Sequence, residues 1–370
     1  MRKRRRIRRR PAGGARLFAR PPKPQKPRLG RRKKAVFSAI TVVLALAILE
    51  GGSRILVQAA PNARWEYSRK LDAALGFPAL NDLFLPDAQL FWKLKPNLRN
   101  NQVSGHYPNT PEIRFAVSTD SAGFRLMPRV HSAPHRVLFL GDSCTFGLGV
   151  EDHQTFPALL QQRMEGVQCV NLAVPAYTAY QGRVLLQQLE PDELPDVLVV
   201  AYGRNDEAIW DNLSDVEHAV LIEAQRTQLT GQFRFAELLR HVRPSLGLGV
   251  PAEQVQRRPR LTDQEFTEQI LAIVAWCRER NVEPILVLWP RLHQMARNER
   301  FPKQRALTQI ARSQGVQLVN LIPLFRDNAE VHPFLDVIHA SPAGCELVAD
   351  ALLPALQQTL GNTARRIARP

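Results

Sequence analysis

Cysteine is scarce in this sequence, which has four in 370 residues: Cys144, Cys169, Cys277 and Cys345. They are widely spaced, with no CxxC pair and no cluster with histidine, which excludes a disulfide-rich scaffold and argues against a zinc site. Cys169 and Cys277 lie within apolar patterns, so we expect them to be small buried hydrophobic residues. One disulfide stays possible if the chain meets an oxidising compartment.

Acidic residues are missing from the first 34 positions, which hold 17 of the 50 lysines and arginines. The other 336 residues carry 33 basic and 34 acidic side chains, so the formal charge of +16 belongs to this tail. The tail is rich in arginine, proline and glycine and too poor in apolar residues to fold. We therefore expect residues 1–34 to form a disordered tail.

Only one apolar run is long enough to suggest a membrane segment. Its uninterrupted core, Ala35 to Leu49, has 15 residues, which as a helix span roughly 22 Å of the roughly 30 Å hydrocarbon layer. Extension to Val57 gives 23 residues and sufficient length, and Glu50 and Arg54 stand at a spacing that allows them to pair near the interface. We predict one transmembrane helix over residues 35–57.

Two other structures are compatible with an apolar segment of this length, a cleavable signal peptide and a buried core helix. The segment VQAA, Val57 to Ala60, loosely resembles a signal-peptide cleavage site, but the long basic flank and the charges before it argue against cleavage. A buried core helix is disfavoured by the same basic flank.

The basic flank also predicts the orientation of the chain. Because lysine- and arginine-rich ends stay in the cytoplasm, we expect a single-pass protein of the inner (cytoplasmic) membrane with its following domain periplasmic or extracellular. Arginine-rich arms also bind nucleic acid, but beside a membrane segment a topology signal or contact with anionic lipid is favoured. We expect no nucleic-acid partner.

From about residue 134 short apolar runs alternate with helical patterns. The strand candidates are Val137–Leu140, Gln168–Leu172, Val197–Ala201, Ile285–Leu288 and Gln317–Asn320. Near-continuous apolar strands that alternate with helices predict a parallel sheet covered on both faces. The domain expected over 134–360 follows a small irregular, β-containing lead-in over 58–133. It contains an insertion over 207–260 and precedes a tail over 361–370.

Polar residues follow the predicted strands at the edge where α/β proteins place their sites. Ser143 follows the first strand on a sharp turn into a helix, and Asn205 follows the third. Asp336 and His339 stand three apart before the last helix, a spacing at which the carboxylate can orient the imidazole. Taken singly, each has an ordinary explanation as a helix cap, a polar turn or a surface pair. Together they supply a nucleophile, an oxyanion donor, an orienting acid and a base.

Three motifs in this order resemble the SGNH (GDSL-like) hydrolase superfamily. The GDS at Gly141–Ser143, the GRND at Gly203–Asp206 and the DVIH at Asp336–His339 match its nucleophile, GxND and DxxH motifs. The membrane helix and the lead-in that ends in DSAGFR look like a membrane-anchored bacterial subgroup. The fold implied is α/β, a flavodoxin-like three-layer α/β/α domain with a five-stranded parallel sheet.

The resemblance implies acyl transfer without metal or cofactor. His339 would take the proton of Ser143, Asp336 would orient His339, and the N–H groups of Ser143 and Ala176 with the amide of Asn205 would meet the oxyanion. The family usually has glycine where this chain has Ala176, which matters if the position needs a positive φ.

The activity expected is that of a serine esterase or O-acyltransferase at the cell envelope. Its partner would be an acyl ester, with an acylated envelope glycan or lipid as candidates. The alternative is a non-catalytic module of the same fold that binds a glycan or a protein. We expect Asp142 to bond to nearby loop backbone, Cys144 to serve packing, and Trp289 either to line the site or to pack.

Overall fold

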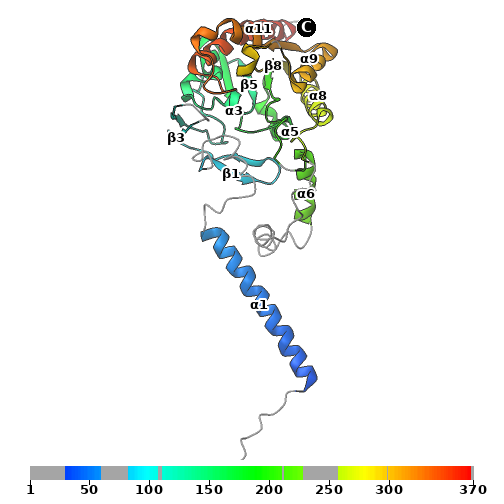
Figure 1. The fold of residues 1–370 in the computed structure, drawn as a ribbon. Coiled ribbons are helices and arrows are strands. Elements are labelled where there is room, and N and C mark those ends of the chain that lie inside the picture. The colour runs from blue at the N-terminus through cyan, green and yellow to red at the C-terminus, as the bar shows by residue number, and fades with distance from the viewer. Residues whose placement is uncertain are drawn as a thin grey trace, which may run out of the picture.

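The computed structural model describes residues 30–59, 82–106, 111–210, 212–227, 257–297 and 299–367 (Figure 1). Most of the predicted basic tail and residues 228–256 of the predicted insertion lie outside the described residues. The first element is helix α1 (Arg31–Ala59). Its stretch Arg31–Ser53, with a mean hydropathy of 2.1, is long and apolar enough to cross a membrane by length and composition.

A five-stranded parallel sheet forms the centre of the domain, in the order β6-β5-β7-β8-β9. Its strands are β5 (His135–Gly141), β6 (Val167–Asn171), β7 (Val197–Ala201), β8 (Glu283–Leu288) and β9 (Gln317–Asn320). The predicted α/β fold class is confirmed, and the strand order reverses beside β5, so that a crevice opens at the carboxyl end of that strand.

Helices lie on both faces of the sheet (Figure 1). They are α3 (Ser143–Phe146), α4 (Phe156–Arg163), α5 (Ala179–Leu186), α6 (Asp215–Thr227), α8 (Asp263–Glu279), α9 (Pro302–Gln314), α10 (Ile322–Asp327) and α11 (Pro342–Ile367). Short 3₁₀ turns are η2 (Asp152–Gln154), η3 (Pro191–Glu193), η7 (Leu292–Met295) and η8 (Ala329–Val331).

The buried side chains of β5 alternate between two apolar cores. Leu138 and Leu140 join the core formed with α5, α8 and α9. Val137 and Phe139 join the other core, formed with α4, α10 and α11. Successive side chains of a strand point to opposite faces, so this alternation explains why β5 is apolar from Val137 to Leu140.

The described part of the lead-in contains two antiparallel strand pairs, in agreement with the β-containing lead-in that the sequence predicts. Strand β1 (Phe84–Asp87) pairs with β2 (Phe91–Leu94), and β3 (Asn101–Gly105) pairs with β4 (Ile113–Val117). Their apolar residues, Trp92 among them, belong to the core shared with α5, α8 and α9. The lead-in is therefore packed on the main domain.

The structure adds detail to the expected division of the chain at two segments. Helix α11 continues to Ile367, so part of the expected C-terminal tail is helical. The described ends of the expected insertion meet each other, because Ile209 bridges Pro259 and the Arg260 N–H donates to the Ala208 carbonyl at 2.8 Å. This closure brings Arg260 back to the third strand end.

Candidate active site

Ser143 is the first residue of α3, directly after the turn that ends β5. Asp142 caps this helix by accepting a hydrogen bond from the Cys144 N–H at 2.9 Å. A side chain at Gly141 would collide with Thr145 and lie 2.9 Å from the Ala201 carbonyl oxygen, so the tight turn requires glycine. The turn places Ser143 at the carboxyl edge of the sheet with only 5% of its surface exposed.

The structure brings Ser143 together with the two residues predicted to act with it. His339 Nε2 lies 2.8 Å from Ser143 Oγ, and His339 Nδ1 lies 2.9 Å from Asp336 Oδ2. With its proton on Nδ1, the imidazole donates to Asp336 and accepts from the Ser143 hydroxyl. The arrangement can remove a proton from Ser143 during attack on a carbonyl.

Asp336 stays ionised in this setting. Burial disfavours its charged form, but hydrogen bonds from the His339 side chain and from the N–H groups of His339 and Ile338 outweigh burial and lower its pKa. The two backbone donors lie 2.6 and 2.8 Å from Oδ1. A charged Asp336 stabilises the imidazolium that forms when His339 accepts a proton.

Two hydrogen bonds hold the loop that carries Asp336 and His339 in place. The Leu335 N–H donates to the His339 carbonyl at 2.8 Å. Trp289, at the end of β8, donates its Nε1–H to the Ile338 carbonyl at 2.9 Å. Trp289 thus supports the loop, and it also borders the small cavity described below.

Two backbone donors lie unused next to this triad. The N–H groups of Ser143 and Ala176 donate to no acceptor in the described part of the chain. The Ala176 loop runs beside the nucleophile turn, since the Val174 N–H donates to the Gly141 carbonyl at 3.3 Å. Ala176 has a φ of +64°, so the position does require the left-handed conformation that glycine adopts more easily.

Asn205 lies at the nucleophile turn, but its amide is already engaged. Its Nδ2 donates to Asp142 Oδ2 at 3.0 Å and to the Tyr177 carbonyl at 3.3 Å. Asp142 was expected to bond to loop backbone, and its backbone donor is instead the Cys144 N–H in the first turn of α3; it also accepts from Asn205. Burial raises the pKa of Asp142, and the hydrogen bond from the Cys144 N–H opposes that rise.

Asp206 follows Asn205 and is fully buried. Its Oδ1 accepts from the Ala179 N–H at 2.8 Å, while Oδ2 has no hydrogen-bond partner. Burial raises the pKa of Asp206 to about 7, despite the bond from Ala179 and the nearby charges of Lys303 and Arg260. The last residue of the GRND motif is thus a buried acid that titrates near neutrality.

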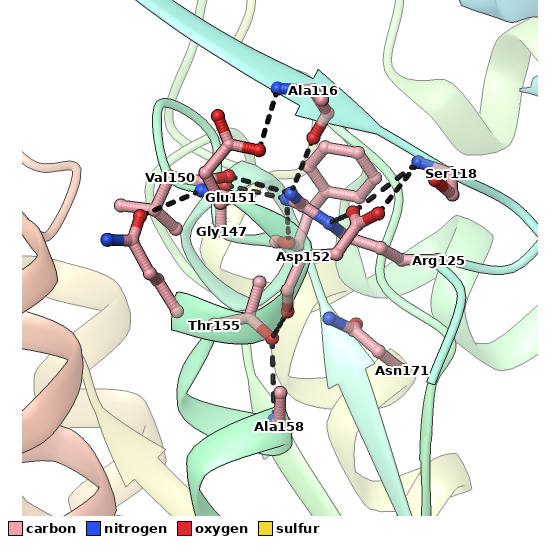
Figure 2. A network of polar contacts seen from close by, with 12 residues as sticks. Ala116, Ser118, Arg125, Gly147, Val150, Glu151, Asp152, Thr155, Ala158 and Asn171 are labelled. Carbon is pink, nitrogen blue, oxygen red and sulfur yellow. Dashed lines mark hydrogen bonds and ion pairs between the residues drawn. The ribbon is translucent and has the colours of Figure 1, made fainter. Parts of the chain in front are cut away.

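Arg125 forms a polar network that sequence reasoning missed (Figure 2). Its Nη1 donates to the carbonyls of Phe146 and Gly147, both at 2.7 Å, and its Nε lies 2.9 Å from Asp152 Oδ1. The side chain is 1% exposed. Phe146 ends the helix that Ser143 begins, so Arg125 fastens the nucleophile helix to the lead-in. The only sequence signal for Arg125 was its position at the end of the DSAGFR segment, which is typical of a turn.

A cavity of about 20 Å³ lies beside Ser143, with room for about one water molecule. Its lining residues are Asp142, Cys144, Ala201, Tyr202, Gly203, Arg204, Trp289, Arg291, Gln304 and Ile338. Burial, with the charges of Asp142 and Asp336, raises the pKa of Cys144 well above its usual value. Cys144 is therefore a packing residue, as expected, and not a second nucleophile.

The four cysteines are all buried and free, and within the described ranges no group of three or more histidine, cysteine, aspartate or glutamate side chains could hold a metal ion. What the site does contain is a serine, a histidine and a carboxylate in one hydrogen-bonded chain at the edge of a parallel sheet. That combination has the geometry of the serine, histidine and carboxylate triads found in serine hydrolases of several unrelated folds.

Comparison with known families assigns the chain within this class. Residues 139–347 match the model of the GDSL-like lipase/acylhydrolase family, and the chain belongs to that family. The match begins within β5 and leaves out α1 and both hairpins of the lead-in.

Several solved structures are similar to part of this chain at low identity. An acetyl xylan esterase, AlAXEase, is 14% identical, with a TM-score of 0.41 over 60% of this chain and 98% of its own. The esterase EstA from Pseudoalteromonas sp. is 14% identical, with a TM-score of 0.41 over 61% and 99%. A GDSL-like lipase from Bacteroides thetaiotaomicron is 13% identical, with a TM-score of 0.38 over 62% and 92%. Likeness at this level says nothing about the ester cleaved here, and no curated protein matches the chain.

Proposed function

We propose that this protein is a membrane-anchored serine esterase or O-acyltransferase that acts at the cell envelope through an acyl-enzyme on Ser143. The observation that carries the proposal is the continuous chain of hydrogen bonds from Ser143 through His339 to Asp336, at 2.8 and 2.9 Å. Family membership supports ester hydrolysis in general.

The reaction follows from this geometry. As Ser143 Oγ bonds to the ester carbonyl carbon, its proton passes to His339 Nε2, and the carbonyl oxygen becomes an oxyanion near the Ser143 and Ala176 N–H groups. The carbon–oxygen bond to the leaving alcohol then breaks, and His339 returns the proton to that alcohol. In the second half, water or an acceptor hydroxyl attacks the acyl carbon while His339 takes its proton. The bond from the acyl carbon to Ser143 Oγ then breaks, and His339 returns the proton to Oγ, which releases the acid or the acylated acceptor and restores the enzyme.

The envelope location rests on α1 and the charge before it. The helix is long and apolar enough to span a bilayer, and the 17 basic residues of positions 1–34 favour a cytoplasmic N-terminus. Reporter fusions at the C-terminus test this topology. Alkaline phosphatase should be active there, and a fluorescent protein that matures only in the cytoplasm should be dark.

Covalent labelling tests the catalytic proposal. The full-length protein in detergent micelles should react with a fluorophosphonate probe and cleave short-chain aryl esters, whereas Ser143→Ala and His339→Ala should do neither. Equal labelling of wild type and Ser143→Ala would overturn the proposal. Product analysis with a sugar acceptor separates the two fates of the acyl group, because a transferase yields an acylated sugar and an esterase yields the free acid.

A further inference from the structure

The peptide that joins Pro175 to Ala176 carries one of the two unused donors. No peptide bond in the described chain is cis. In a planar trans peptide the Pro175 C=O and the Ala176 N–H point in opposite directions. A contact that holds the Pro175 oxygen therefore also sets the direction of the Ala176 N–H.

Trp92 of the lead-in makes that contact. Its Nε1–H donates to the Pro175 carbonyl oxygen at 3.2 Å, and the Tyr177 hydroxyl donates back to the Trp92 carbonyl at 2.6 Å. The indole is fully buried, and its ring lies edge-on to the Tyr177 ring with 5.7 Å between centroids. Two reciprocal bonds thus join β2 to both sides of Ala176.

Arg260 holds the other side of the same residue. Its Nη1 donates to the Ala176 carbonyl at 2.5 Å. Asp215 fixes the guanidinium by accepting from Nε at 3.1 Å and from Nη2 at 2.7 Å. The guanidinium also lies over the ring of Trp210, with Cζ 3.9 Å from the ring centroid. Both charged side chains are nearly fully buried.

The backbone of Ala176 needs such support. A left-handed φ of +64° is unfavourable for an L-residue with a β-carbon, and such a conformation persists only where the surroundings determine it. The hydrogen bonds from Trp92 to the Pro175 carbonyl and from Arg260 to the Ala176 carbonyl hold the backbone in this conformation.

We propose that Trp92 and Arg260 are positioning residues of the oxyanion hole, which hold the 175–176 peptide so that the Ala176 N–H meets the developing negative charge. The inference rests on the proposed function and deepens it. Trp92 lies outside the family match, which begins at residue 139, and Arg260 closes the predicted insertion. The lead-in and the insertion ends are therefore parts of the catalytic unit, and the family domain alone would keep the Arg260 contact but lack the one from Trp92.

Trp92→Phe is the direct test, because phenylalanine keeps an aromatic ring and removes the indole N–H. Loss of a whole oxyanion donor lowers kcat by roughly 10²–10³-fold. A donor that is present but poorly aimed should cost less, and we expect kcat to fall roughly 10-fold with KM within twofold. The rate of fluorophosphonate labelling should fall in parallel, since the phosphonyl oxygen occupies the same hole.

Trp276→Phe is the matched control. Trp276 is 7% exposed and lies in α8, away from the Ala176 loop. The same change of side chain there should lower thermal stability without lowering kcat per folded molecule. A purely structural Trp92 would behave like Trp276.

Arg260→Lys in the full-length protein is an independent test of the positioning role. Lysine keeps a charge for Asp215 but lacks the fork that bonds Asp215 and Ala176 together. We expect the same loss in kcat with KM unchanged, and this variant decides the matter if Trp92→Phe does not fold. Values of kcat within twofold of wild type in both variants would overturn the inference while Ser143-dependent turnover stands. Wild-type protein without such turnover would instead overturn the proposed function, and the inference with it.

Discussion

The side-chain amide of Asn205 donates to the carboxylate of Asp142 at 3.0 Å and to the carbonyl of Tyr177 at 3.3 Å, so both of its N–H groups are occupied. The shorter bond ends on a buried carboxylate, whose hydrogen bonds are the stronger kind. The longer bond, to Tyr177, is the one that an oxyanion on a bound substrate can replace.

Asn205→Ala should therefore lower kcat by roughly 10²–10³-fold, the usual cost of losing an oxyanion donor, with little change in KM. Steady-state kinetics on a short-chain aryl ester measure both constants. A fall of less than about tenfold, with a lower melting temperature, would mean that Asn205 only ties Asp142 to the Tyr177 loop.

We expect Arg125 to contribute mainly to the free energy of unfolding. Arg125→Gln removes the ionic partner of Asp152, whose side chain is 25% exposed, and leaves several buried carbonyls beside the nucleophile helix without a donor. Each buried acceptor left without a partner costs about 1–3 kcal/mol. Arg114→Gln is the matched control, since Arg114 pairs with Glu112 at 2.9 Å on the same lead-in with side chains 75% and 50% exposed. Such an exposed pair contributes about 0–1 kcal/mol.

Urea unfolding of both variants in detergent micelles separates the two cases. Equal free-energy losses for Arg125→Gln and Arg114→Gln would contradict the role given to the buried network.

Asp206 should make stability depend on pH between about 4 and about 7. Burial raises its pKa to about 7, against roughly 3.9 in an unfolded chain. Between these values the native state binds more protons than the unfolded state, so the free energy of unfolding falls as pH rises, and levels off above pH 7. Asp206→Asn removes this dependence and leaves an oxygen that can accept from Ala179.

The variant should thus gain stability relative to wild type from pH 5 to pH 8, by an amount on the order of a few kcal/mol. The groups that face Asp206 are Lys303, Arg260 and Asp142, and they are the same in both proteins. Urea unfolding at four pH values measures the difference, with the exposed Asp327→Asn as control. A difference that does not change with pH would refute the assignment.

The sheet and the triad could be predicted because each depends on short-range signals. Apolar runs bounded by polar turns marked all five strands to within about two residues. The signal is clearest in β5, β7 and β8, whose apolar runs are buried on both faces of the sheet, whereas β6 and β9 each carry two polar residues. Ser143 stands directly after β5, and the DVIH motif marks Asp336 and His339 in the loop before α11, although α10 and η8 separate that loop from β9.

The support of the site could not be predicted in the same way. Trp92 and Arg260 act through contacts to carbonyls 83 and 84 positions away, and a backbone carbonyl has no sequence signature. Arg125 stood within a recognisable turn, but nothing local indicates that its guanidinium is buried against the nucleophile helix. The bonds of Asn205 to Asp142 and Tyr177 depend on side-chain rotation, which strand ends do not determine.

Ala176 offers the most sensitive test of the oxyanion geometry. Ala176→Gly relieves the left-handed strain of roughly 1–2 kcal/mol, but it removes a fully buried methyl group worth roughly 0.8 kcal/mol. It also frees the unfolded chain by roughly 0.4–1 kcal/mol. These effects nearly cancel, so unfolding should change by no more than about 1 kcal/mol, and the N–H that serves the oxyanion is kept.

Ala176→Val should behave differently, because a β-branched side chain fits a φ of +64° poorly and has no room at a fully buried position. The loop must then shift, and kcat should fall by at least about 100-fold while Ala176→Gly keeps kcat within a few-fold of wild type. Kinetics and thermal unfolding of the two variants measured side by side check this contrast. Equal activities would mean that the Ala176 N–H takes no part in the reaction, since only its direction differs between the two proteins.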